Sequence, residues 1–124
     1  MAEEKTVLVV DDTESNIDIL VEILGDDYDV SVAMDGETAL EIIVDIQPQL
    51  VLLDIMMPGM DGYDVLRQIK SGERTKHIPV VFVSAKNEID DKLDGIEMGA
   101  AGYIGKPIDS EDVLTTVERV LAGR

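Results

Sequence analysis

Five polar side chains that suit phosphate and metal chemistry stand at or after the ends of short apolar runs. They are Asp11, Asp12, Asp54, Ser84 and Lys106. Three carboxylates within a few ångströms of one another cannot all stay ionised without a compensating cation. Mg²⁺ suits that role, because it prefers carboxylate, carbonyl and water oxygens and leaves positions open for phosphate oxygens. These residue types therefore predict a magnesium site that also receives a phosphoryl group.

Asp54 is the candidate nucleophile of this set. An aspartate can attack a phosphoryl group and form an acyl phosphate. Asp54 directly follows the apolar run 50–53, where an ionised carboxylate without a partner would be costly to desolvate. Lys106 and Ser84 would add a cation and a hydroxyl donor for the phosphoryl oxygens. With Mg²⁺, they would stabilise the charge that spreads over the equatorial oxygens during transfer.

Each of these residues has a simpler explanation when it is taken alone. The pair Asp11 and Asp12 before a helix is typical of a solvated helix cap. The dipeptide Lys106-Pro107 is typical of a turn, in which proline makes a cis peptide bond accessible. Ser84 alone indicates little. The prediction depends on all of these features falling at strand ends in the right order.

The apolar pattern predicts five strands. Residues 6–10, 50–53 and 80–83 are short, uninterrupted apolar runs, which are typical of strands buried on both faces of a parallel sheet. Residues 28–33 form a weaker candidate strand and residues 103–104 a very short one. The carboxyl ends of parallel strands share one edge of a sheet, and ligands bind there. The five polar residues are therefore expected to converge in one crevice.

Helical spacing of apolar residues alternates with these strands, and it predicts five helices. The spaced residues are Ile17, Leu20, Val21 and Leu24; Ala39, Leu40 and Ile43; Val65, Leu66 and Ile69; Ile89, Leu93 and Ile96; and Val113, Leu114, Val117, Val120 and Leu121. Alternating strands and helices favour parallel pairing through right-handed crossovers. We expect an α/β fold, with a doubly wound five-stranded parallel sheet between two helical layers.

Composition limits the classes of protein that the chain can belong to. A length of 124 residues and 45% hydrophobic content predict one folded domain over residues 1–124. The absence of cysteine excludes disulfides and thiolate chemistry. A net charge of −17 argues against direct binding of nucleic acid or anionic lipid. No run approaches the roughly 20 apolar residues of a membrane span. We expect a cytoplasmic protein without membrane insertion.

Four motifs carry a resemblance to a known family. They are Val-Val-Asp-Asp at 9–12, Asp-Ile-Met-Met-Pro-Gly-Met-Asp-Gly at 54–62, Val-Ser-Ala at 83–85 and Tyr-Ile-Gly-Lys-Pro at 103–107. From about residue 5 to residue 121 the chain resembles the receiver domains of two-component response regulators. The resemblance implies a flavodoxin-like (βα)5 fold with strand order 2-1-3-4-5.

The resemblance assigns roles to the acidic residues. It implies that Asp54 is the phospho-acceptor of a phosphorelay. Asp12, Asp54 and the main-chain carbonyl of Met56 would ligate Mg²⁺, and Asp11 would hold the metal partly through water. The domain would catalyse its own phosphorylation and dephosphorylation without being a multiple-turnover enzyme.

The resemblance also implies a conformational switch. Ser84 and Lys106 would contact the phosphoryl oxygens, and Tyr103 would be the switch aromatic that swings inward as Ser84 moves toward the phosphate. Such a switch is a bistable element biased by a local change of charge. The fourth helix, the fifth strand and the fifth helix would form the output surface.

Partners follow from the same resemblance. The phosphoryl donor would be the phosphohistidine of a sensor histidine kinase or of a histidine phosphotransfer domain. The helix that begins near Glu14 would form much of the kinase-docking surface. An output domain or a separate effector protein would respond to phosphorylation.

Two positions in this family border the path of the hydrolytic water, and here they are Met56 and Lys86. Our hypothesis is that the apolar Met56 and the long, cationic Lys86 shield the acyl phosphate and prolong its lifetime. The methionines at 56, 57 and 60 are expected to pack beside the site rather than to form an adhesive surface. His77, the only histidine, is expected to face solvent.

Three other classes of protein share parts of this pattern. A degenerate receiver would bind a partner without phosphorylation, but the complete polar set argues against it. A phosphatase of the haloacid-dehalogenase type also forms an aspartyl phosphate, but it needs a second aspartate at the position of Met56. A flavodoxin-like cofactor module is disfavoured because Asp11 and Asp12 would repel the cofactor phosphate.

Overall fold

The computed structural model describes residues 5–85 and 99–123. The strands are β1 (Thr6–Val10), β2 (Asp29–Ala33), β3 (Leu50–Asp54), β4 (Val80–Ala85) and β5 (Gly102–Lys106). The helices are α1 (Glu14–Leu24), α2 (Gly36–Ile46), α3 (Gly62–Ser71) and α5 (Ser110–Ala122). The predicted helix that contains Ile89, Leu93 and Ile96 lies outside the described residues.

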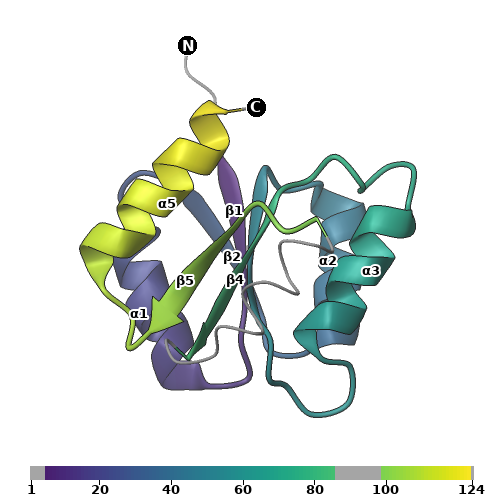
Figure 1. Ribbon diagram of the computed structural model, residues 1–124, viewed down its shortest axis with the longest axis horizontal. Helices are drawn as coiled ribbons and strands as arrows, with labels where there is room; N and C mark the ends of the chain where they lie inside the picture. Colours follow the sequence, from purple (N-terminus) through teal and green to yellow (C-terminus); the bar gives the residue numbers. More distant parts are fainter. Residues whose placement is uncertain (1–4, 86–98, 124) are drawn as a thin grey trace.

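All five strands belong to one parallel sheet with the order β2-β1-β3-β4-β5. Helices α1 and α5 cover one face of this sheet, and α2 and α3 cover the other (Figure 1). The predicted doubly wound α/β fold and the strand order implied by the resemblance are both confirmed. Such a sheet is buried on both faces, as parallel sheets almost always are.

The uninterrupted apolar runs of β1 and β3 fill two core clusters from opposite faces of the sheet. Leu8 and Val10 point into the α2/α3 core cluster, whereas Val7 and Val9 point into the α1/α5 core cluster. Successive side chains of a strand alternate between the two faces, so each strand contributes to both clusters. All five residues of β3 are buried. The inference that continuous hydrophobicity marks doubly buried strands is therefore confirmed.

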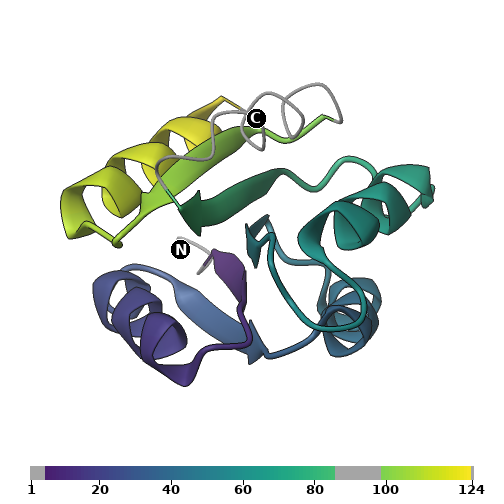
Figure 2. The same cartoon turned by 60° about the horizontal axis from the view of Figure 1, so that its bottom comes forward.

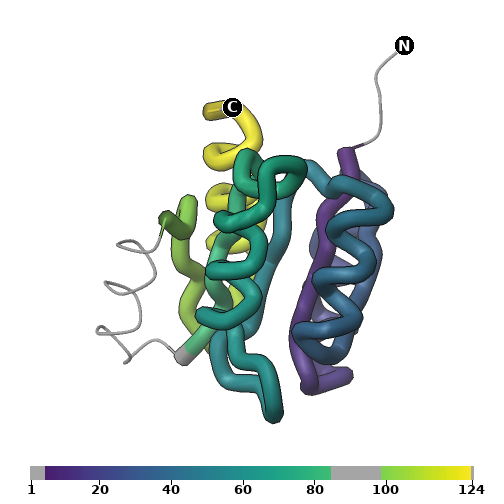
Figure 3. Tube along the Cα trace, turned by 90° about the vertical axis from the view of Figure 1, so that its right-hand side faces the viewer, coloured from purple at the N-terminus to yellow at the C-terminus, as the bar shows by residue number. Residues whose placement is uncertain are grey.

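Strand register aligns the carboxyl ends of the strands at one edge of the sheet. Val10 lies opposite both Ala33 and Leu53, and Asp54 lies opposite Val83. Figure 2 is turned so that this edge comes forward. In Figure 3, β1 begins and α5 ends on the opposite side of the molecule from this edge. The polar residues that end the strands therefore gather in one place.

Aspartates define where several helices begin. The side chains of Asp35, Asp61 and Asp109 accept hydrogen bonds from main-chain N–H groups in the first turns of α2, α3 and α5. At α3 the cap is reciprocal, since Asp64 accepts in turn from the main-chain nitrogen of Asp61 at 3.2 Å. These caps satisfy amide donors that a helix leaves unpaired and place negative charge at the positive end of its dipole.

Within the described parts of the chain, no helix combines the length and the apolar character that are needed to cross a membrane.

Candidate functional site

Three carboxylates meet at the carboxyl edge of the sheet. Asp11 and Asp12 follow β1, and Asp54 is the last residue of the neighbouring strand β3. Each offers an oxygen, and the three oxygens lie within 4.8 Å of one another. Asp11 and Asp54 are almost fully buried, with 1% and 4% of their surface exposed, whereas Asp12 is exposed. The structure thus brings together the trio that the sequence placed at strand ends.

Lys106 brings a positive charge to this trio from the end of β5. Its Nζ lies 3.3 Å from Oδ1 of Asp54, to which it donates a hydrogen bond, and 3.4 Å from Oδ2 of Asp11. The peptide bond between Lys106 and Pro107 is cis, the isomer that proline makes accessible. One ammonium group therefore contacts two buried carboxylates.

The pKa of Asp54 reflects the electrostatic balance of the site. Burial, and then the charge of Asp11, raise the pKa of Asp54 to about 6, with a smaller contribution from Asp12. The charge and the hydrogen bond of Lys106 act in the opposite direction without reversing the shift. Low dielectric and nearby like charge both disfavour the ionised carboxylate. One lysine therefore does not fully compensate the negative charge of the site.

The surroundings of one oxygen of Asp11 indicate which kind of ion fits the site. Oδ1 of Asp11 accepts a hydrogen bond from the main-chain nitrogen of Thr13 at 2.8 Å, which orients the side chain. Oδ2 is buried and accepts no hydrogen bond from any residue in the ranges 5–85 and 99–123. Buried polar atoms are almost always partnered. Oδ2 thus has only the ion-pair contact with Lys106. An all-oxygen donor set with a buried carboxylate oxygen that accepts no hydrogen bond fits a hard cation such as Mg²⁺.

Ser84 lies on β4, which neighbours the strand of Asp54, and Tyr103 lies on β5, the next strand of the sheet. Ser84 is 3% exposed and directly follows Val83, the residue opposite Asp54 in the sheet. Tyr103 of β5 lies opposite Phe82 of β4. Its side chain is partly buried and packs against the α2/α3 core cluster. The structure thus places Ser84 near the carboxyl end of β4, and it places Tyr103 near the start of β5, level with Leu53 in the sheet. Their phosphate-contacting and switching roles stay predictions.

The three methionines of the loop that follows β3 differ in their exposure to solvent. Met57 is 8% exposed and belongs to the α2/α3 core cluster, against which Met60 also packs. Met56 does not pack into this core, because 68% of its surface is exposed. That all three lie beside the site stays a prediction. Lys86 lies outside the described residues. His77 is exposed, as expected.

Gly62 supports the site in a way that the sequence analysis did not recognise. Its main-chain nitrogen donates a hydrogen bond to the carbonyl of Ile55 at 2.8 Å, closing the loop after β3. A Cβ atom at residue 62 would lie 2.5 Å from the main-chain oxygen of Asp54. Only glycine allows this close approach of helix α3 to the acceptor residue. The feature of the sequence that could have indicated this close approach is a glycine at the first position of helix α3.

Comparison with known proteins gives the family. The family model of the response regulator receiver domain matches residues 7–118. This chain belongs to that family. The resemblance inferred from the four motifs is thereby confirmed. As a receiver, it is a signalling domain of two-component systems.

The receiver is similar to parts of several response regulators. It is 46% identical over 104 residues to PleD of Caulobacter vibrioides, a match that covers 83% of this chain and 23% of PleD. It is 37% identical over 118 residues to the DNA-binding transcriptional regulator RpaA of Synechocystis, covering 93% of this chain and 48% of RpaA. The crystal structure of the NtrX receiver domain from Brucella abortus superimposes with a TM-score of 0.89 at 34% identity, covering 95% and 99% of the two chains.

The first of these relatives are much longer than the receiver. The matched region spans only 23% of PleD and 48% of RpaA. In these two relatives, the receiver domain is therefore one part of a longer protein.

The titration of Asp54 predicts how stability depends on pH in metal-free solution. Because the pKa of Asp54 is raised from 3.8 to about 6 in the folded state, protonation of this carboxyl group favours folding. The contribution to stability is complete below pH 4 and is lost as the pH rises through 6. Asp54→Asn removes the disfavoured charge. In EDTA at pH 7 it should therefore raise the free energy of unfolding, by up to about 3 kcal/mol. The gain should shrink toward zero at pH 4. Urea unfolding across this pH range measures it.

Asp109→Asn is the matched control for this pH series. It removes an acidic side chain that caps α5 and does not belong to the acidic trio. Its effect on stability should lack the rise between pH 4 and pH 7. An Asp54→Asn effect that does not depend on pH would contradict the electrostatic origin.

Gly62→Ala should destabilise the receiver and displace the main chain of Asp54. The added methyl group meets backbone atoms, which cannot move aside as a side chain can. The expected loss is about 1–3 kcal/mol of unfolding free energy, as for other overpacked positions. Gly123→Ala is the control, because the nearest contact of its Cβ would be an ordinary 3.5 Å. Equal denaturation midpoints for the two variants would refute this account.

Proposed function

We propose that this receiver accepts a phosphoryl group on Asp54 with the help of Mg²⁺ and uses the modified site to control a partner. The observation that carries this proposal is the contact of one ammonium group, Lys106, with two buried carboxylates, Asp11 and Asp54. Membership of the receiver family makes phosphate acceptance the general role of such a site. The assignment of each residue is our inference.

Asp54 is the nucleophile in this proposal. A carboxylate oxygen of Asp54 forms the new bond to phosphorus, while the bond from phosphorus to a histidine ring nitrogen of the donor breaks. The leaving nitrogen keeps the electron pair of that bond. Burial between β1 and β4 excludes water and makes each charge interaction in the site stronger than in solvent.

The remaining polar groups stabilise the transferred phosphoryl group. Lys106 Nζ would turn from the Asp54 carboxylate to a phosphoryl oxygen, and the Ser84 hydroxyl would donate to another. Asp11, Asp12, Asp54 and the main-chain carbonyl of Met56 would hold the cation. When bound, Mg²⁺ supplies positive charge that offsets the carboxylates and the phosphoryl oxygens.

The signal would leave the site through β4 and β5. These strands are paired from Val81 to Ala85, so Ser84 and Tyr103 belong to adjacent strands of one rigid sheet. A shift of Ser84 toward the phosphoryl group would make room for the ring of Tyr103, which is already partly buried. The switch therefore needs only a small movement at the sheet edge.

The partners and the setting of this receiver form part of the same proposal. The donor is a phosphohistidine on a sensor histidine kinase or a histidine phosphotransfer domain, and α1 contributes to docking it. The output is a further domain or an effector protein in the cytoplasm. Residues 1–124 act as one receiver domain. Such a domain turns over once for each signal and is not a multiple-turnover enzyme.

Intact mass after incubation with acetyl phosphate tests the proposal directly. The native chain should gain one phosphoryl group with Mg²⁺ and none in EDTA, because the carboxylates repel the donor when no cation is present. Asp54→Asn should gain none under either condition, whereas Asp109→Asn should behave like the native chain. Equal labelling of Asp54→Asn would exclude Asp54 as the acceptor. No gain from acetyl phosphate or from a phosphohistidine donor would instead indicate a degenerate receiver that binds without phosphorylation.

The exposed side chain of Met56 predicts a measurable effect on the lifetime of the phosphoryl group. If its apolar surface shields the acyl phosphate, Met56→Asn should increase the dephosphorylation rate, and Lys86→Glu should also change it. Met34→Asn is the matched control, because Met34 is an exposed methionine beyond the end of β2. Loss of phosphoryl label over time gives the rates. Unchanged rates in both Met56→Asn and Lys86→Glu would refute the shielding hypothesis.

A further inference from the structure

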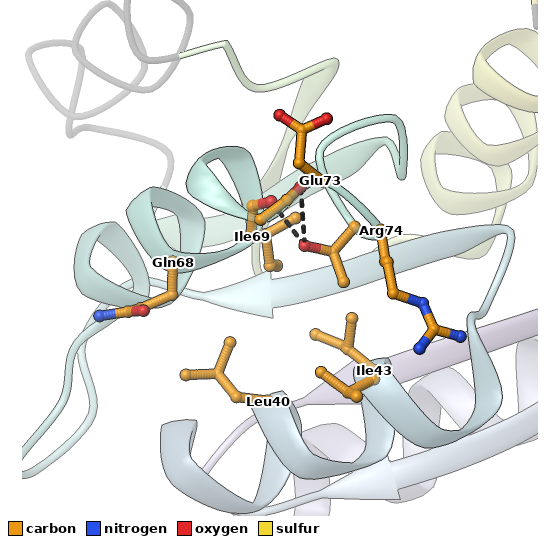
Figure 4. Close-up of a pocket in the computed structure, with 9 residues that line it drawn as sticks. Leu40, Ile43, Gln68, Ile69, Glu73 and Arg74 are labelled. Carbon is orange, nitrogen blue, oxygen red and sulfur yellow. Dashed lines mark hydrogen bonds between the residues drawn. The ribbon is translucent and has the colours of Figure 1, made fainter.

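A groove lies between α2 and α3, on the face of the sheet that these helices cover. It has a volume of about 360 Å³, and its lining comes from the carboxyl-terminal half of α2, the end of α3 and the loop that follows α3. None of the residues at the acidic site lines it. Figure 4 shows Leu40 and Ile43 rising from α2 toward Ile69 of α3.

The floor of the groove is apolar, and its wall on α2 is open to solvent. Ile43 and Ile69 are buried beneath it, and Leu40 is only partly buried. Val44, which also lines the groove, is 55% exposed. Leu40 and Val44 are four residues apart and therefore lie on the same side of the helix. Together they leave apolar side-chain surface open at the side of the groove.

An acidic row runs beside this apolar row on α2. Glu37, Glu41 and Asp45 are exposed and spaced four residues apart. None of the three forms an ion pair with a residue in the described ranges 5–85 and 99–123. The sequence has no Lys, Arg or His between Lys5 and Arg67. The α2 side of the groove is therefore negatively charged, and α2 itself contributes no cation to offset that charge.

The exposed large apolar side chains among the described residues lie in this same stretch of the chain, between Lys5 and Arg67. They are Ile19, Val32, Met34, Val44, Ile46 and Met56. The stretch between Lys5 and Arg67 therefore combines exposed apolar side chains with acidic residues and contributes no cation of its own.

The far wall of the groove carries one cation. Glu73 is paired with Lys76 at 3.1 Å, so its charge is balanced. Arg74 lines the groove, is exposed, and forms no ion pair with a described residue. In Figure 4, Arg74 lies at the end of the groove opposite Gln68. A partner therefore meets negative charge along α2 and a positive charge at one end.

We propose that this groove docks a cationic amphipathic helix of a partner protein. Apolar side chains at helical spacing would fill the groove over Leu40 and Val44, as in other helix-in-groove complexes. Lysines or arginines on the flank of that helix would face the row Glu37, Glu41 and Asp45. A second copy of this chain fits poorly, because its net charge of −17 would place acid against acid.

A fluorescent peptide tests this proposal on the full chain. The probe is an amidated helical peptide with leucines at i, i+3, i+4 and i+7 and lysines elsewhere. A second peptide with glutamates in place of the lysines is its control. Anisotropy should show binding of the lysine peptide only. Tight binding of the glutamate peptide, or none of the lysine peptide, would overturn the proposal.

Two glutamate substitutions distinguish docking of the lysine peptide in the groove from non-specific electrostatic attraction of this peptide to an acidic protein. Val44→Glu should weaken binding of the lysine peptide about tenfold or more, because it places a charge in the apolar row. Ile19→Glu on α1 adds the same charge at an exposed apolar position outside the groove and should leave binding unchanged or slightly tighter. If Val44→Glu binds as tightly as the native chain, the attraction is only electrostatic and the proposal fails.

A direct map of the contact completes the test. Amide chemical shifts on peptide addition should change along α2 and α3, and Asp54→Asn should give the same map because the groove excludes the phosphorylation site. Changes confined to the surroundings of Asp11 and Asp54 would overturn the proposal without affecting the proposed phosphoacceptor role. Thermal melting confirms that Val44→Glu is folded, as its exposure predicts.

Discussion

The need to compensate negative charge at the end of two buried strands is the constraint on which this structure depends. Asp11 and Asp54 are almost fully buried at the carboxyl edge of β1 and β3, and Lys106 is the ammonium group that contacts both. Burial and mutual repulsion hold the pKa of Asp54 at about 6. The receiver therefore holds a site whose negative charge is only partly offset, and such a site favours binding of a cation.

The rest of the fold holds this arrangement in place. The apolar runs of β1, β3 and β4 anchor the strand ends in two cores, so the carboxylates cannot separate to relieve their repulsion. Gly62 lets α3 approach the main chain of Asp54, and the reciprocal cap of Asp61 and Asp64 fixes where that helix begins. Packing thus opposes an electrostatic repulsion that would otherwise open the site. Functional sites commonly keep such locally unfavourable groups in position through rigid surroundings.

The molecule presents two different surfaces to possible partners. The carboxyl edge of the sheet carries the acidic trio and Lys106, whereas the α2/α3 groove carries an apolar row beside the exposed carboxylates of α2. The two share no lining residue. In PleD and RpaA the matched region is 23% and 48% of a longer protein. Under the two proposals above, a phosphoryl donor would act at one surface while a partner helix binds at the other.

Sequence alone determined the elements that depend on local pattern. Continuous apolar runs predicted the buried strands, helical spacing predicted the described helices, and the strand-end positions of Asp11, Asp54 and Lys106 predicted a shared crevice. These predictions succeeded because side-chain periodicity and the common edge of a parallel sheet follow from backbone geometry. The strand order came from the family resemblance, since spacing does not distinguish one crossover order from another.

Other features were decided only by the tertiary structure. The exposure of Met56, the close approach of Gly62 to Asp54 and the groove beside Val44 depend on how distant segments pack. The same is true of the pKa of Asp54, which depends on burial and on the distances to Asp11 and Lys106. A one-dimensional pattern contains neither the separation of two side chains nor the solvent between them. Tertiary packing sets both, and the charge of the site follows from them.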